Sequence, residues 1–219
     1  MRIQKNVSLL VLLALTAVLF MSGVADFQSV AGVFSENMSA FLKMLIIFAG
    51  CIIISPLPAA LLCSGSKFWR GLWYLLAGLA ASGAALFMLF TIKFATDASA
   101  AVVIAVFVSV LIISTAFIIS DVRVHKKTID RLEERGVRAS VIKRKTAIKN
   151  FYSLIFENSG RVASVTVALY LIGDTMVLGG ELGCRFVQSA DILSYVLAVL
   201  CAVAVTALIG NIIALWIER

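Results

Sequence analysis

Apolar residues gather along the chain in six long runs separated by short polar stretches. A transmembrane helix needs about 20 mostly apolar residues, because each residue advances the helix by about 1.5 Å and the hydrocarbon core is about 30 Å thick. Every run is close to this length, so the pattern predicts six membrane spans. The predicted spans are Val7–Val24, Phe41–Cys63, Gly71–Ile92, Ala98–Ser120, Val162–Gly180 and Ile192–Ile217. Pro56 and Pro58 predict a kink or a break near the end of the second span.

The composition agrees with a membrane protein. Of the 219 residues, 62% are hydrophobic and 14% are charged, whereas a soluble domain carries about 25% charged residues. Gly23-Val24-Ala25 imitates a signal-peptide cleavage site, but we interpret the first run as a retained span. We therefore expect an all-α, polytopic integral membrane protein. Residues 1–120 would hold spans one to four, residues 121–160 a basic cytosolic segment, and residues 161–219 spans five and six.

Positive charge is unevenly distributed across these spans. With the N-terminus in the cytosol, 16 of the 19 Lys and Arg residues fall on the cytosolic side. The three exceptions are Lys43, Lys93 and Arg185. Since cytosolic loops carry an excess of Lys and Arg, we expect both termini in the cytosol. Trp69, Trp73 and Trp216 agree, because all three fall at predicted cytosolic interfaces, where amphipathic rings settle.

The longest charged stretch lies between the fourth and fifth spans. Residues 121–150 hold ten of the 19 basic residues. Their pattern predicts a cytosolic helical hairpin of Asp121–Arg135, which could extend the fourth span, and Ser140–Glu157, with Asn158-Ser159-Gly160 ending the second helix. Gly136 suits a C-terminal cap between the two helices. Val141, Ile148, Phe151 or Tyr152, and Ile155 share one apolar stripe of the second helix.

Nine of the ten basic side chains of this stretch are expected to dock a partner or to bind lipid headgroups. They are Lys126, Lys127, Arg131, Arg135, Arg138, Lys143, Arg144, Lys145 and Lys149. Each such residue near anionic headgroups contributes about 1 kcal/mol. Direct nucleic-acid binding is less favoured, since it needs aromatic side chains that stack on bases, and Phe151 and Tyr152 fit the apolar stripe better. His125 is the only histidine and has no neighbour at ligand spacing, so neither a metal nor a cofactor is expected.

Small residues recur every fourth position in the sixth span. The members of this small-residue ridge are Ser194, Ala198, Ala202, Thr206, Gly210 and Ala214. Such a ridge lets two helix backbones approach closely, within one chain or between copies. We favour a contact between subunits of a homo-oligomer, with a tetramer as the working stoichiometry. A looser version in the third span comprises Gly71, Gly78, Ser82 and Ala85.

Asp174 is the one acidic residue well inside a predicted span. An ionised carboxylate there costs about 3 kcal/mol or more, so Asp174 should face the interior of the helix bundle. Intramembrane acids often mark ion or proton paths, and Asn211 is the next polar candidate. The two residues are expected to lie about 15 Å apart in depth. We favour a structural or oligomer-stabilising role of Asp174 over a transport role.

Recognised enzyme signatures are absent from the chain. It contains no HExxH, GxSxG or GxxxxGK[ST] motif. Gly173-Asp174 imitates the Gly-Asp pair of intramembrane aspartyl proteases, whose chemistry needs a second membrane aspartate that no other span supplies. Asn37-Met38-Ser39 matches a glycosylation sequon, which we interpret as chance. Cys184 in an outside loop is more simply an unpaired thiol than a disulfide between subunits.

In its layout the chain resembles KwaA, the membrane subunit of the two-component Kiwa anti-phage defence system. The resemblance is carried by the small size, the clustered spans, the minimal outside loops and the basic stretch DVRVHKKTIDRLEERGVRASVIKRKTAIKN, residues 121–150. It implies an oligomeric sensor in the bacterial inner (cytoplasmic) membrane that engages a soluble effector acting on nucleic acid. No functional residues are carried over from it.

The sequence therefore favours a non-enzymatic membrane scaffold or sensor that oligomerises and recruits a cytosolic effector through its basic segment. The alternative is a small ion or solute transporter or channel that uses Asp174 and Asn211. A third hypothesis is an immunity or exclusion protein that acts by contact within the membrane.

Overall fold

The computed structural model of the protein describes residues 27–64, 66–94, 98–134, 151–177 and 192–217, together with four single positions before residue 27. Of residues 64, 82–94, 98, 99, 101, 123–133 and 175–177 it describes the backbone alone. Every secondary-structure element in these ranges is an α-helix. The prediction of an all-α protein is confirmed for this part of the chain. The predicted span Val7–Val24 lies outside it apart from the single positions.

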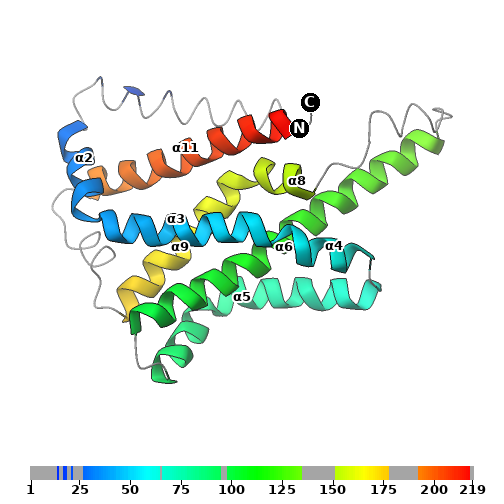
Figure 1. The fold of residues 1–219 in the computed structure, drawn as a ribbon, viewed down its shortest axis with the longest axis horizontal. Helices are drawn as coiled ribbons and strands as arrows, with labels where there is room; N and C mark the ends of the chain where they lie inside the picture. Colours follow the sequence, from blue (N-terminus) through cyan, green and yellow to red (C-terminus); the bar gives the residue numbers. More distant parts are fainter. Residues whose placement is uncertain are drawn as a thin grey trace.

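The helices pack into one bundle around α6 (Figure 1). They are α2 (Phe27–Glu36), α3 (Met38–Ile54), α4 (Pro56–Ser64), α5 (Lys67–Phe94), α6 (Ala98–Glu134), α8 (Phe151–Glu157), α9 (Ser159–Val177) and α11 (Ile192–Ile217). Figure 1 shows α3, α6 and α11 running in one direction and α5 and α9 running in the other. Helix α6 contacts α3, α4, α5, α8 and α9, so its apolar half forms the centre of the core.

Three helical stretches among the described residues are long and apolar enough to cross a membrane: Met38–Cys63, Val102–Val122 and Ile192–Ile217. They correspond to the second, fourth and sixth predicted spans, which supports a membrane protein. Their outer faces are apolar as well, since Leu45 of α3 and Ile212 of α11 are more exposed than buried. The third and fifth predicted spans fall on α5 and α9, and their passage through the membrane stays a prediction, as does the topology.

The predicted break in the second span is present at Ser55. Helix α3 ends at Ile54 and α4 begins at Pro56, because prolines 56 and 58 have no N–H group to donate to the carbonyls of Ile52 and Ile54. Two backbone bonds still cross the break, from the Ser55 amide to the Cys51 carbonyl at 2.9 Å and from the Ala59 amide to the Ser55 carbonyl at 3.2 Å. The chain therefore bends at this point and continues as a helix.

The stretch before α3, which we expected to form an outside loop, is mostly helical. Helix α2 buries Val30 and Val33 and packs against α11. Asn37 joins α2 to α3 as a buried turn, and its amide nitrogen donates to the Val33 carbonyl at 2.9 Å. The Asn37 side chain therefore caps the end of α2, and the interpretation of the sequon as a chance match stays a prediction.

The charged segment begins on α6 without any interruption of the helix. Helix α6 has 37 residues, so residues 123–134 extend about 18 Å beyond the apolar stretch that ends at Val122. The first helix of the predicted hairpin is therefore the extension of the fourth span, as the sequence allowed. Of the second predicted helix, the structure describes only Phe151–Glu157, as α8. Gly136, the proposed cap, lies outside the described residues.

Candidate functional site

A polar contact joins the two ends of the charged segment. The Asn158 amide nitrogen donates to a carboxylate oxygen of Asp121 at 2.6 Å and to the Leu154 carbonyl at 2.9 Å. An Asn amide group has two donor hydrogens, and this geometry uses both. Asp121 opens the charged stretch on α6, and Asn158 follows α8 directly. The contact therefore closes residues 122–157, the main part of the basic segment, into a loop with a fixed base.

A third side chain completes this network. An Nη atom of Arg161 donates to the Asn158 side-chain carbonyl at 3.2 Å, and the guanidinium lies 6.0 Å from the centroid of the Phe117 ring on α6. Asn158 is only 1% exposed. Its buried amide links the carboxylate of Asp121 to the guanidinium of Arg161 beside the apolar core. Polar networks with little access to water are strong when every member is satisfied, and this one holds α6, α8 and α9 together.

The sequence did not identify this network. We expected Asn158-Ser159-Gly160 to end a helix, and α8 does end at Glu157. The prediction missed that a single-residue turn at Asn158 leads directly into α9 at Ser159. The Asn158 amide bonds to the Leu154 carbonyl at 3.2 Å, and the Val162 amide bonds to the Asn158 carbonyl at 3.0 Å. The backbone thus changes direction with little loss of hydrogen bonding. The one available signal was that polar side chains flank the charged segment on both sides.

Helix α8 is built into the bundle although it belongs to the segment expected in the cytosol. It buries Ser153, Leu154 and Ile155 and contacts α3, α4, α6 and α11. Ile155 of the predicted apolar stripe is fully buried, and Val141 and Ile148 of the same stripe lie outside the described residues. The Tyr152 hydroxyl donates to the Ile53 carbonyl at 3.5 Å, beside the break between α3 and α4. The end of the basic segment is therefore anchored in the core.

The basic side chains proposed for docking are not placed by these contacts. Lys126, Lys127 and Arg131 lie on α6, where the structure describes the backbone alone. The other six, Arg135, Arg138, Lys143, Arg144, Lys145 and Lys149, lie outside the described residues. Their role in docking stays a prediction.

Most of the small-residue ridge on α11 packs within the chain. Ser194, Ala198, Gly210 and Ala214 are buried in a single copy, where they cannot also line a subunit contact. For these four residues, the contact between subunits that we favoured is replaced by packing within one chain, the alternative that the sequence left open. Ala202 and Thr206 are half-buried. Gly71 and Gly78 of the looser ridge face open space, and only the backbone of Ser82 and Ala85 is described.

The tightest part of this contact is at Gly210. A Cβ atom at this position would overlap the side chain of Ser159 and would lie 2.9 Å from the Phe156 carbonyl oxygen. A Cβ atom at Gly160 would in turn lie 2.8 Å from the Cβ of Ala207. The turn at Asn158 can approach α11 this closely because glycine stands on both sides of the contact.

Asp174 is 2% exposed, so the prediction that it faces the bundle interior is confirmed. It shares the buried face of α9 with Ser159 and Thr166. Asn211 is half-buried on α11, and its amide donates to the Ala207 carbonyl of its own helix at 2.9 Å. Asp174 lies near the end of α9 and Asn211 in the second half of α11, and these parts lie at opposite ends of the bundle (Figure 1). They do not form one site.

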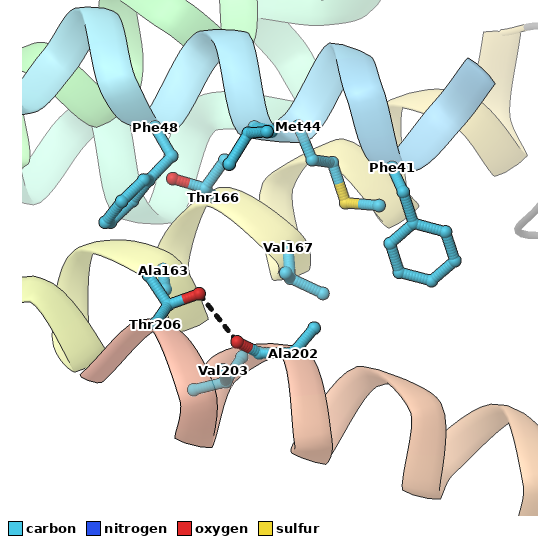
Figure 2. Close-up of a pocket in the computed structure, with 10 residues that line it drawn as sticks. Phe41, Met44, Phe48, Ala163, Thr166, Val167, Ala202, Val203 and Thr206 are labelled. Atoms are coloured by element: carbon cyan, nitrogen blue, oxygen red, sulfur yellow. Dashed lines mark hydrogen bonds between the residues drawn. The ribbon is translucent and has the colours of Figure 1, made fainter. Parts of the chain in front are cut away.

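An apolar pocket of about 210 Å³ lies between α3, α9 and α11 (Figure 2). Met44, Phe48 and Val167 are among its lining residues, and Ala202 and Thr206 bring the half-buried part of the ridge to its wall. The hydroxyls of Thr166 and Thr206 donate to carbonyls of their own helices, at 2.8 Å and 2.6 Å. The wall therefore offers no free polar donor that would orient a polar solute.

Metal-binding side chains do not gather anywhere in the described part of the chain: no three His, Cys, Asp or Glu residues there lie close enough to hold an ion. Cys51, Cys63 and Cys201 are free thiols, and the buried Cys51 thiol lies 3.5 Å from the Phe107 carbonyl oxygen of α6. Free cysteines inside a helix bundle commonly act as small apolar residues. Cys184 lies outside the described residues.

Comparison of the chain with protein-family models, with curated proteins and with solved structures finds no match.

Proposed function

We propose that the protein is a non-enzymatic membrane scaffold or sensor that recruits a cytosolic effector through the basic segment. The observation that carries the proposal is the hydrogen bond between Asp121 and Asn158. A flexible loop that only covers lipid headgroups does not need a fixed base. A docking surface does, because ordering a flexible segment at the moment of binding lowers the affinity.

Two further features support the same function. Helix α6 leads from the apolar core into the charged segment as one element, so its extension has a defined direction. Helix α8 returns the chain into the core. The segment between them carries most of the positive charge in residues 121–150, which suits an acidic surface on a soluble protein.

The cellular setting is part of the same proposal. The layout resembles the membrane subunit of the Kiwa system, so we place the protein in anti-phage defence in the bacterial inner membrane, with both termini in the cytosol. The effector would be a soluble protein that acts on nucleic acid, and the scaffold would be a homo-oligomer. Since four residues of the ridge on α11 pack within the chain, the subunit contact would use other surfaces.

Purification from the native host in a gentle detergent tests this function. We expect a soluble protein to copurify in a fixed ratio with the wild-type chain. Simultaneous reversal of charge at Lys143, Arg144 and Lys145 should remove it, while Lys67→Glu, which changes an exposed basic residue on the same predicted side, should not. An oligomer that carries lipid alone, or equal loss of the partner in the Lys67 control, would contradict the proposal.

A transporter or channel is the second candidate, and one observation favours it. Asp174, Thr166 and Ser159 form a polar stripe on the buried face of α9, and intramembrane acids often mark ion paths. The substitution Asp174→Asn separates the two functions. A scaffold would keep its partner and its activity with this change, whereas a transporter would lose ion flux and would tolerate reversal of the three basic residues.

A further inference from the structure

The start of α5 presents an unsatisfied positive charge next to exposed aromatic residues. The Nε atom of Arg70 is fully covered by protein and has no hydrogen-bond partner among the described residues. The Arg70 side chain as a whole is half-buried, so only part of its guanidinium can reach water. Burying a charged donor without a partner costs free energy. Because the Nε atom is covered, an anion from outside the chain would bind the outer nitrogens of the guanidinium and balance its charge there.

The surroundings of Arg70 indicate where that anion comes from. Phe68 and Trp69 precede it and are 72% and 56% exposed, with their rings in edge-to-face contact at 5.9 Å. On the neighbouring helix α4, Leu57 and Leu61 are also exposed. A site for a soluble anion has no use for large apolar side chains in water. The acyl chains of a lipid would cover them, and aromatic rings commonly settle at the headgroup level.

Charge and position favour a lipid with a net negative charge. Lys67 is exposed one turn before Arg70, so two positive charges stand together at the end of the helix. The apolar stretch Met38–Cys63 ends just before this point, which puts both charges at the depth of a phosphate group. The next turn of α5 is fixed, because the Trp73 indole N–H donates to the Ile112 carbonyl of α6 at 3.1 Å. Arg70 is therefore held by a rigid element.

We propose that Arg70 and Lys67 bind the phosphate of an anionic phospholipid whose acyl chains lie along Phe68, Trp69 and Leu61. Arginine binds phosphate through paired N–H groups, which a point charge such as Lys cannot reproduce. The phosphate would contact the outer nitrogens of the guanidinium and balance its charge, while the Nε atom stays covered by protein. This site is separate from the basic segment and does not require an effector protein.

Native mass spectrometry of the full chain in a neutral detergent tests the site. The probes are dioleoylphosphatidylglycerol and dioleoylphosphatidylcholine, which share their acyl chains and differ in net charge. We expect the wild-type protein to retain the first lipid at least tenfold more strongly than the second. Equal retention of both lipids by the wild-type protein would overturn the proposal without any variant.

Two variants with the same change in charge sharpen the test. Arg70→Gln should reduce retention of phosphatidylglycerol at least tenfold, and Arg70→Lys should reduce it less. Lys43→Gln is the control, because it also removes one positive charge but lies near the start of α3, away from the start of α5, and it should retain the lipid within twofold. Equal losses for Arg70→Gln and Lys43→Gln would reduce the effect to general charge and would contradict the site.

Competition with inorganic phosphate and thermal unfolding provide two further tests of the lipid site. Phosphate in millimolar excess should leave the lipid bound, and its displacement of the lipid would assign the site to a free anion instead. In detergent without anionic lipid, Arg70→Gln should unfold at the same or a higher temperature than wild type, because it removes an unpaired charge. Added phosphatidylglycerol should raise the melting temperature of the wild type alone. A rise of the same size in Arg70→Gln would contradict the assignment.

Discussion

At the scale of single residues, Asn158 has the most consequences in the described structure. Its side chain satisfies a carboxylate on α6, a carbonyl on α8 and a guanidinium on α9. The Asn211 side chain, by contrast, donates to the Ala207 carbonyl of its own helix. Asn158 differs because its second donor leaves its own segment and fixes a residue 37 positions earlier.

We expect Asn158→Ala to destabilise the protein by about 1.5–3 kcal/mol, the range for a lost hydrogen bond to a charged group. Thermal unfolding in detergent measures the loss, and copurification of the effector should fall with it, because the base of the basic segment is no longer fixed. Asn211→Ala is the control. It removes an amide bonded to a carbonyl at the same spacing, and its effect should stay below about 1 kcal/mol. If the two variants unfolded alike, the contact with Asp121 would contribute nothing.

At the scale of helices, the bundle depends on positions where a glycine lets a neighbouring helix or turn come close to the backbone. Gly210 allows α11 to touch the turn at Ser159. Gly50 of α3 does the same for α6, since a Cβ atom there would lie 2.8 Å from the Phe107 ring. By contrast, Gly71 and Gly78 of α5 have nothing within 4 Å of such an atom. Small residues therefore have different roles on different helices of one chain.

The substitution Gly210→Ala should destabilise the protein by about 1–3 kcal/mol, because the added methyl group overlaps Ser159 in a packed contact. Gly71→Ala adds the same group in open space and should be neutral or stabilising by up to about 1 kcal/mol, through helix propensity. Chemical or thermal unfolding of both variants in one detergent provides the comparison. In the double variant Gly210→Ala/Ser159→Gly, removal of the Ser159 side chain should restore part of the lost free energy of unfolding. Failure of this rescue would mean that the contact is not where the structure puts it.

The helices that the sequence predicts well are those defined by local chemistry. The second, fourth and sixth spans follow from the length of an apolar run, and the break at Ser55 follows from two prolines without N–H groups. Helix α2 was missed because its 10 residues are short beside a window of about 20. The ridge on α11 indicated close packing but not its partner. Ser159 is 51 positions away, and no periodicity connects it to Gly210.

At the scale of the whole molecule, the side chains at one end of the bundle provide a test of its position in the bilayer. Trp69 and Trp216 are 56% and 78% exposed, and Figure 1 shows the start of α5 and the end of α11 on the same side. Trp73 is half-buried and donates to Ile112. The sequence assigned all three indoles to one interface, whereas the structure turns Trp73 toward α6.

Three variants that each keep one tryptophan, with phenylalanine at the other two positions, test this arrangement by fluorescence in lipid nanodiscs. We expect brominated lipids to quench Trp69 and Trp216 strongly and Trp73 weakly, because its indole is shielded by α6. Iodide in the aqueous phase serves as the control. Strong quenching of Trp69 and Trp216 by iodide, with no effect of the brominated lipids, would contradict an interfacial position of this end.

The uninterrupted course of α6 has a mechanical consequence. Its apolar part packs between neighbouring helices, and residues 123–134 extend about 18 Å further. The contact of Asp121 with Asn158 holds the helix in place between these two parts. Membrane helices are tilted by about 20° on average, and a change of tilt is one way in which a helix accommodates a change in bilayer thickness. A change of about 10° in α6 would swing the tip of the extension by about 3 Å. Thinning or stretching of the membrane would thus displace the positive charge that α6 carries beyond the apolar core.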